Sequence, residues 1–249
     1  MNYRKLLERK NAVIINANSE SGQAVALKFA EHGAIVGAGV NDVGGSESFL
    51  AELRKLSPES FTVKCNLADG NSCEEFGREI NRRFSVVNVI VNNPYMKTKG
   101  GLLETTDEDD DILDQVYQRS HVQIMRAVWT NMLEAGNCAV VNISLGTAFK
   151  PIIGDPFNTG FNASVGGFSR VEVAEGAKKF IRSNEILAAR GLYEDTQASS
   201  PLKDSGTTRT DIECVADTAL FLASDMAGYI NGVSINVDGG AKRALSGVF

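Results

Sequence analysis

The sequence is poor in the features that mark several large classes of protein. It has no apolar run long enough to span a bilayer and no charged-then-apolar leader. Its four cysteines form no Cys-x-x-Cys pair, which predicts reduced thiols and no structural zinc. Lysine and arginine gather into no stripe, and the formal net charge is -6, which opposes binding to nucleic acid phosphates. We therefore expect a soluble, cytoplasmic protein that binds no membrane, nucleic acid or metal.

The apolar content and its order along the chain predict the fold. Of 249 residues, 43% are hydrophobic, which suits a single domain over residues 1–249. The expected strands are residues 12–15, 34–38, 61–63, 87–91, 139–143, 184–187 and 233–237. One helix is expected directly after the first strand, and further helices are expected over residues 46–56, 73–84, 107–134, 158–182 and 211–224. Alternating strands and helices predict an α/β fold, a Rossmann-type doubly wound seven-stranded parallel sheet with helices on both faces.

An acidic run at residues 106–111 allows two interpretations. Clustered carboxylates can bind a hard cation. Acids in a first helical turn also complement the helix dipole, and Thr106 can cap that turn. We favour the helix start, and we interpret Lys178, Lys179 and Arg182 in the same way as charges at a helix end.

The most specific segment lies near the C-terminus. Residues 216–225 read ADTALFLASD, and residues 232–240 read GVSINVDGG. Residues 24–34, 89–93 and 139–144 fall at matching intervals. In these segments the chain resembles a classical-type short-chain dehydrogenase/reductase over nearly its whole length. The resemblance implies a nicotinamide dinucleotide cofactor and hydride transfer to or from a carbonyl carbon.

The family's phosphate-binding loop, Thr-Gly-x-x-x-Gly-x-Gly, is altered here. Its fixed positions count to Ile15, Asn16, Glu20 and Gly22, so one glycine remains. Asn16 can tolerate the left-handed backbone that the first glycine provides. Glu20 stands where the cofactor pyrophosphate approaches a helix N-terminus. At ~4 Å and an effective dielectric of ~20, the two negative charges would repel by roughly 4 kcal/mol.

Two more cofactor positions depart from the family pattern. The acid that binds the adenosine ribose in NAD-preferring members counts to Val40, with Asp42 two residues late. Residues 92–95 read Asn-Asn-Pro-Tyr, so Tyr95 replaces a glycine beside the cofactor. We therefore predict that this chain has no cofactor-binding residues and binds no dinucleotide, and that NAD is held by a partner subunit.

The catalytic positions are changed as well. The family's tyrosine, and the lysine four residues later that lowers its pKa, count to Phe161 and Val165. Its serine counts to Leu145, or to Ser144 after a slip of one residue. The remaining changes are at the asparagine position, which counts to Tyr117 or Ser120, and at the Pro-Gly after the sixth strand, which is replaced around residues 188–190. We predict that the chain carries no catalytic residues, since phenylalanine has no proton to give.

Other residues could replace the lost acid. Tyr95 and Lys99 have the right separation but fall in an expected loop. Tyr117 and His121 share a helix face, and histidine can donate a proton at neutral pH. His32 is better explained as a residue at a helix C-terminus.

Three functions remain open on these residues. The first is a non-catalytic subunit of a heteromeric NAD-dependent short-chain alcohol dehydrogenase, acting on a CoA-thioester alcohol in aromatic degradation. The resemblance implies assembly with an active short-chain dehydrogenase subunit through residues 107–134, 158–182 and 233–237. The second is an oxidoreductase with a rearranged active site at Tyr117 and His121. The third is a ligand-sensing scaffold protein.

Overall fold

The computed structural model describes residues 5–97, 100–149, 151, 155–189 and 211–240. Seven parallel strands form one sheet in the order β3-β2-β1-β4-β5-β6-β7. The strands are β1 (Asn11–Ile14), β2 (Ile35–Val40), β3 (Phe61–Lys64), β4 (Val89–Asn92), β5 (Ala139–Leu145), β6 (Arg182–Ala188) and β7 (Ser234–Val237). This confirms the predicted fold class, and each predicted strand is present with shifted ends.

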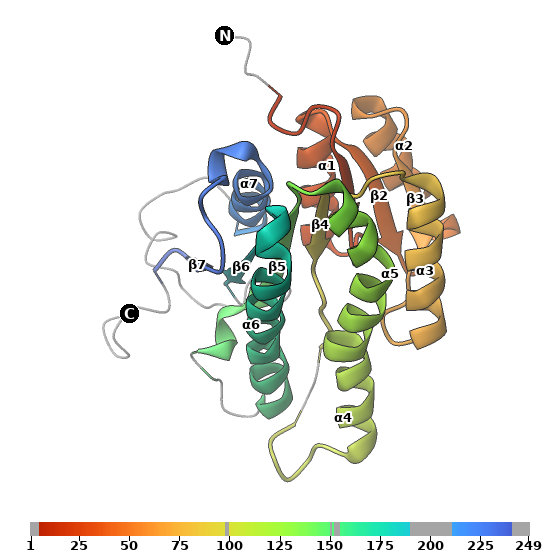
Figure 1. The fold of residues 1–249 in the computed structure, drawn as a ribbon. Helices are drawn as coiled ribbons and strands as arrows, with labels where there is room; N and C mark the ends of the chain where they lie inside the picture. The colour runs from red at the N-terminus through yellow and green to blue at the C-terminus, as the bar shows by residue number, and fades with distance from the viewer. Residues whose placement is uncertain (1–4, 98–99, 150, 152–154, 190–210, 241–249) are drawn as a thin grey trace.

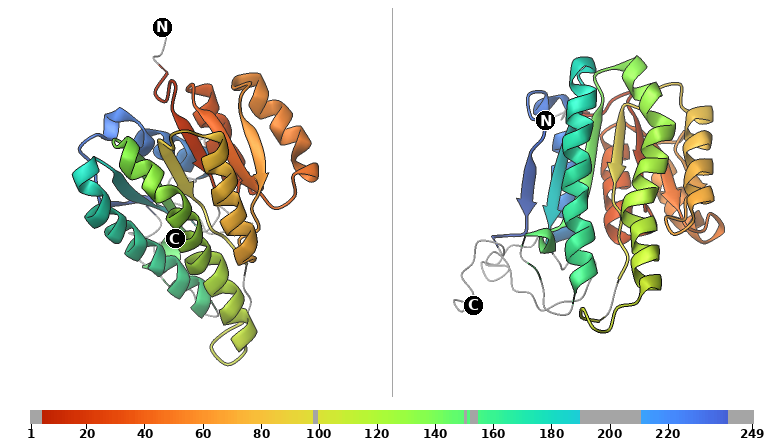
Figure 2. Two further views of the ribbon diagram at one scale, coloured as in Figure 1. Left: turned by 45° about the vertical axis from the view of Figure 1, so that its right-hand side comes forward. Right: turned by 60° about the horizontal axis from the view of Figure 1, so that its bottom comes forward.

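Helices cover both faces of the sheet, as Figures 1 and 2 show. They are α1 (Glu20–Glu31), α2 (Glu47–Leu56), α3 (Gly70–Arg83), α4 (Asp107–Asp114), α5 (Ser120–Ala135), α6 (Pro156–Gly176) and α7 (Asp211–Ala223). Short 3-10 turns are η1 (Gly44–Ser46), η3 (Gly146–Ala148), η4 (Ala177–Lys179) and η6 (Asp225–Ala227). Helices α1, α2 and α7 bury one apolar cluster against the sheet, and α3, α5 and α6 bury a second.

The long helix expected over residues 107–134 is divided. A π-helical segment, η2 (Gln115–Arg119), separates α4 from α5. Such segments widen the helix by one residue per turn and are frequent at functional sites. The predicted start is confirmed, because Thr106 and Asp109 form a reciprocal capping box over the acidic turn.

Close packing of α3 on α5 explains one glycine. A Cβ atom on Gly77 would lie 2.4 Å from the Cβ atom of Ala127, so the two helices could not approach each other as they do. None of the helices in the described ranges is both long and apolar enough to cross a membrane.

Candidate functional site

The strand order changes direction between β1 and β4, and open α/β sheets bind ligands at such a point, outside the carboxyl ends of the strands. The loop after β1 and the loop after β4 meet there. Asn16 donates its amide to the carbonyl of Asn93 at 3.0 Å. Asn93 in turn donates to the hydroxyls of Ser19 and Ser21, both at 3.1 Å. These hydrogen bonds therefore join the two loops to each other.

The loop after β1 keeps the backbone shape of a phosphate-binding turn. Asn16 has φ of 57°, so it adopts the left-handed conformation that the sequence predicted it would tolerate. A Cβ atom on Gly22 would lie 2.3 Å from the carbonyl oxygen of Asn16, so a glycine is required there. Ser19 caps α1 by accepting a hydrogen bond from the backbone of Gly22 at 3.1 Å. The helix N-terminus is thus built as in a dinucleotide-binding turn.

Glu20 is the first residue of α1, and its side chain is exposed. In bulk water, two unit charges ~4 Å apart interact by about 1 kcal/mol, a quarter of the value at the dielectric that the sequence argument assumed. The repulsion that Glu20 exerts on a phosphate is therefore modest, and salt screens it further.

The ribose side of the site differs from the family pattern as the sequence predicted. Val40 is buried, and β2 ends there. Asp42 is exposed and accepts a hydrogen bond from the backbone of Gly44 at 3.0 Å. The side-chain oxygen of Asn18 accepts one from the backbone of Asn41 at 3.2 Å. Tyr95 is half-buried and packs against the apolar cluster beneath α1 and α7.

Tyr117 lies against the loop that follows β4. It lies in η2, is 1% exposed, and donates its hydroxyl to the side-chain oxygen of Asn158 at 3.1 Å. The backbone N–H of Met96 donates to the same hydroxyl at 3.3 Å. The ring stacks on Phe161 with centroids 5.9 Å apart. Burial raises the pKa of the Tyr117 phenol well above its usual value, so it is a weaker acid than a free tyrosine.

Two asparagines face the strand ends from the first turns of α6, and the sequence argument missed them. Asn162 accepts a hydrogen bond from the backbone of Leu145 at 2.8 Å and donates to the carbonyl of Asn158 at 2.8 Å. Phe161 and Val165, the residues that counting assigned to the tyrosine and lysine, are buried instead in the core beneath α3 and α5. Asn158 and Asn162 are four residues apart in α6, so they share one face of that helix. This is the face that meets β5. Counting from the end of β5 and from Pro156, rather than from the aromatic residue, would have found them.

The other proposed pair is not brought together as one acid site. The imidazole of His121 lies 2.8 Å from a carboxylate oxygen of Glu172 and stacks on Phe168 at 4.4 Å. The hydroxyl of Tyr117 has a different partner, Asn158.

The remaining candidates are placed as follows. Ser144 donates its hydroxyl to Glu185 at 2.7 Å, beneath α6. Successive side chains of a strand point to opposite faces of the sheet, so Ser144 does not share the face of Leu145. Ser120 donates to the carbonyl of Val116. His32 forms the C-cap of α1, as predicted. Lys99 and Arg190 lie outside the described residues.

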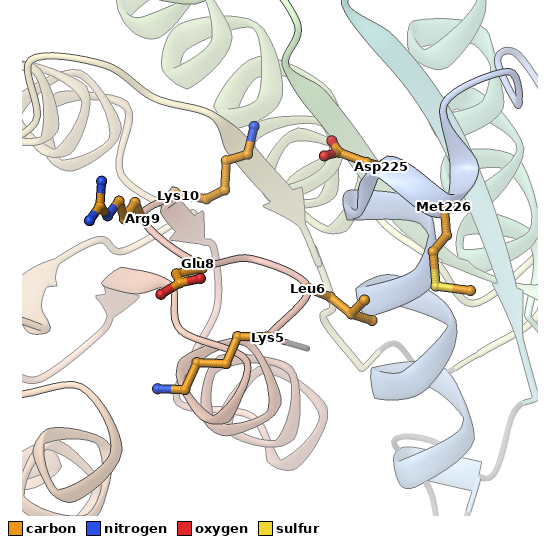
Figure 3. Close-up of a pocket in the computed structure, with 7 residues that line it drawn as sticks. All are labelled: Lys5, Leu6, Glu8, Arg9, Lys10, Asp225 and Met226. Atoms are coloured by element: carbon orange, nitrogen blue, oxygen red, sulfur yellow. The ribbon is translucent and has the colours of Figure 1, made fainter. Parts of the chain in front are cut away.

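A charged pocket of about 450 Å³ lies at the opposite ends of the strands from the candidate site. Figure 3 shows Lys10 and Asp225 pointing toward one another across it, with Leu6 and Met226 at one side. Lys10 precedes β1, so this pocket lies at the amino ends of the strands, the edge that dinucleotides do not use in open α/β sheets.

The sequence is similar to those of known proteins over most of its length. A family model described as enoyl-(acyl carrier protein) reductase matches residues 17–242. The 3-oxoacyl-[acyl-carrier-protein] reductase FabG of Staphylococcus epidermidis is 30% identical over 93% of this chain and 98% of its own length. The L-rhamnose 1-dehydrogenase (NAD(P)(+)) of a Sphingomonas species is 26% identical over 95% of this chain and 97% of its own length.

Solved structures show the same fold. A putative short-chain alcohol dehydrogenase from Sinorhizobium meliloti superposes with a TM-score of 0.86 at 23% identity, covering 97% of this chain and 100% of its own. An NADH-dependent reductase, A1-R', complexed with NAD, gives 0.82 at 21%, covering 95% and 98%. L-sorbose reductase from Gluconobacter frateurii, complexed with NADPH and L-sorbose, gives 0.85 at 22%, covering 97% and 100%.

These findings correct the prediction about the cofactor. The sequence argument held that this chain binds no dinucleotide and that only a partner would carry NAD. Structures of the same fold hold NAD and NADPH. The electrostatic part of the argument also failed, because the side chain of Glu20 is exposed to solvent. The prediction is therefore wrong.

Proposed function

Because the chain belongs to the short-chain dehydrogenase/reductase family, we propose that it binds NAD or NADP itself, in a nicotinamide-dependent oxidoreductase. The N-terminus of α1, with Ser19 and Ser21 beside it, would take the pyrophosphate. Asn93 would hold the loop after β4 against this turn. When bound, the dinucleotide supplies or accepts a hydride.

Titration of the purified chain with NAD and NADP tests this binding. Glu20→Lys replaces the repelling charge with an attracting one, so we expect at least a fivefold gain in affinity, which unfolding could not imitate. Gly22→Ala places a Cβ atom against the Asn16 carbonyl and should abolish binding. Gly160→Ala is the matched control, because a Cβ atom there has nothing within 4 Å among the described residues. Equal affinity in all four proteins would contradict the proposal.

We further propose that this chain is the non-catalytic subunit of a heteromeric short-chain dehydrogenase. The observation that carries this is the hydrogen bond from Tyr117 to Asn158, with Asn162 behind it. A carbonyl that accepts hydride must also gain a proton. The carboxamides of Asn158 and Asn162 are poor acids, and Tyr117 is buried with both hydrogen-bonding roles of its hydroxyl used.

The partner proposed is an active short-chain dehydrogenase subunit. We propose that the complex is of the kind of the heterotetrameric (hydroxyphenylmethyl)succinyl-CoA dehydrogenase of anaerobic toluene degradation, in which this chain would be the inactive subunit and the partner would act on a CoA-thioester alcohol. Helices α5 and α6 and the edge strand β7, where Ser234 and Asn236 are exposed, are the surfaces available to such a partner. Native mass spectrometry of the protein from its own organism tests the assembly. A homo-oligomer with turnover would contradict it.

A rearranged active site is the second candidate. Its support is that η2 brings the Tyr117 hydroxyl to the loop after β4, at the strand ends where open α/β sheets bind their ligands. Tyr117→Phe separates the two functions. In a silent subunit this variant leaves the turnover of the complex unchanged, whereas in a rearranged enzyme it removes the turnover of the isolated chain. Stabilisation by small metabolites without any turnover would favour a ligand sensor instead.

A further inference from the structure

The loop before α4 presents two adjacent leucines to solvent. The side chains of Leu102 and Leu103 are 82% and 100% exposed. The turn that carries them is held by its own hydrogen bonds. The backbone N–H of Gly101 donates to the carboxylate of Glu104 at 2.8 Å, and the backbone N–H of Glu104 donates to the carbonyl of Gly101 at 3.0 Å. We call residues 101–104 the leucine turn. Contiguous exposed apolar side chains rimmed by polar residues mark interaction sites.

The leucine turn is surrounded by negative charge. From Glu104 to Asp111 the sequence has six acids and no lysine or arginine. Five of these six acids are exposed, and the sixth, Asp109, is half-buried in the capping box at the start of α4. The N-terminus of α4 offsets only part of this charge, because the helix dipole acts within its first turn. A surface that receives the two leucines must therefore combine an apolar wall with a positively charged rim.

The charged pocket at the amino ends of the strands, which we call the amino-end pocket, has a rim of this kind (Figure 3). Its cations are Lys5, Arg9 and Lys10. Its two acids are Glu8 and Asp225. A fourth cation lies beside Asp225, because the guanidinium of Arg182 donates to the carbonyl of the preceding residue at 3.2 Å. With this cation included, positive charge exceeds negative charge around the pocket.

The apolar wall of the amino-end pocket is formed by two side chains. Leu6 is half-buried and packs against the apolar cluster beneath α1 and α7. Met226, in η6, is 67% exposed. The pocket volume of about 450 Å³ falls within the range of sites that enclose small molecules, so it has room for two leucine side chains. The pocket therefore offers both features that the leucine turn requires.

The two surfaces lie at opposite ends of one molecule, so they can meet only between copies. Lys10 directly precedes β1, which places the pocket at the amino ends of the strands. The leucine turn follows β4 and precedes α4, and Figure 1 shows it at the far end of the molecule from residues 5–10. A contact between two different surfaces is heterologous, and it repeats from copy to copy unless the rotation closes a ring.

We propose that the leucine turn of one copy docks in the amino-end pocket of a second copy. The two leucines lie against Leu6 and Met226, and the acids around them face the three cations of the rim. A contact made by one turn buries less than ~1,200 Å², the size of weak, transient interfaces. Assembly therefore depends on protein concentration, and it weakens as salt screens the charges. It uses neither the dinucleotide crevice nor the edge strand β7.

Analytical ultracentrifugation of the purified full-length protein tests the contact. The average mass should rise with protein concentration, and the double variant Leu102→Ser with Leu103→Ser should lose that rise. Leu56→Ser is the matched control, because this leucine is 44% exposed at the end of α2, outside both surfaces. Met226→Glu adds an acid to the pocket and Met226→Lys adds a cation. The first should weaken assembly at least fivefold more than the second.

Mixing the variants gives the sharpest result. The leucine-turn variant keeps an intact pocket, and Met226→Glu keeps an intact leucine turn. Together they should form one-to-one pairs that neither forms alone and that grow no further. A mixture that stays unpaired, or assembly that survives in both variants, overturns the proposal. No assembly of the unchanged protein would assign the leucine turn to an unlike partner and overturn it too. Mass is the only readout, so the result does not depend on whether NAD or NADP binds.

Discussion

The layer beneath α1 and α7 and the layer beneath α6 are packed by different kinds of contact. Beneath α1 and α7 the core is apolar, with side chains such as Phe29, Val36 and Leu222 fully buried. Beneath α6 the buried layer is largely polar. A row of polar residues crosses four strands in register, from the buried Asn92, Asn142 and Glu185 to the exposed Ser234 on the edge strand.

Hydrogen bonds join this polar layer to α6 and α5. Glu172 accepts hydrogen bonds from Asn142 at 2.9 Å and from Ser183 at 2.7 Å. Its other carboxylate oxygen lies 2.8 Å from His121. Asn142 in turn accepts from Asn92 at 2.7 Å. A single network therefore connects β4, β5, β6, α5 and α6.

The difference has a physical consequence. Apolar packing stabilises in proportion to buried area and tolerates side chains of similar volume. A buried polar network is directional, and losing one member leaves its partner without compensation. Substitutions that keep the side-chain volume should therefore cost little stability beneath α1 and α7, whereas substitutions in the polar layer beneath α6 should destabilise the protein.

The largest effect is expected from His121→Ala. It leaves one oxygen of the buried Glu172 carboxylate without its hydrogen-bond partner, while Asn142 and Ser183 still bind the other, so the free energy of unfolding should fall by about 3–4 kcal/mol. His121→Phe should recover little, because volume is not what is lost. Urea denaturation measures both. His32→Ala is the control, since the buried Nδ1 of His32 has no hydrogen-bond partner in the described structure. A loss below 1 kcal/mol would show that the network adds little.

On the apolar face, Leu222→Ala should cost about 3 kcal/mol through lost burial and the cavity left behind. Leu222→Met, which nearly keeps the volume, should cost less than about 1.5 kcal/mol. The same denaturation experiment applies. Equal losses in the two variants would remove the contrast between the faces.

Glu185→Gln should have a smaller effect of opposite sign. The Glu185 carboxylate accepts from Ser144 at 2.7 Å and from Ser234 at 2.5 Å. A carboxamide can keep both contacts, because a serine hydroxyl can reverse its role. Removing the buried charge should raise stability by about 1 kcal/mol. Glu52→Gln, on the exposed surface of α2, should change nothing. Clear destabilisation by Glu185→Gln would mean that the charge itself holds the row.

The smallest effect concerns alkaline pH. Burial raises the pKa of Tyr117 above that of an unfolded tyrosine, which ionises near pH ~10. Above that pH the unfolded chain has lost this proton and the folded chain has kept it, so the stability falls as the pH rises. Tyr117→Phe should lose about 1 kcal/mol less than the unchanged protein between pH ~10 and ~11. If the curves of unfolding free energy against pH ran parallel for the two proteins, Tyr117 would ionise as freely in the folded chain as in the unfolded one.

The fold was predictable because each strand is a short apolar run, and Thr106 marks a helix start. The polar row could not be predicted, because the partners of Asn142 and Glu185 depend on the register between strands, which the sequence does not show. The break at η2 was missed because one added residue barely disturbs a helical pattern. In the site, Asn16 was anticipated from its backbone preference. Asn158 escaped because counting started from an aromatic residue.

The position of β1 in the middle of the sheet has a consequence for synthesis. Of the seven strands described, β1 leaves the ribosome first, and it can pair with β2 soon afterwards. Its other edge pairs with β4, and one hydrogen bond on that side, from Asn11 to Asn88, spans 77 residues. At roughly 5–20 residues per second, translation of that span takes about 4–15 s. Until then that edge of β1 presents unpaired backbone N–H and C=O groups, which could pair with a strand of another chain.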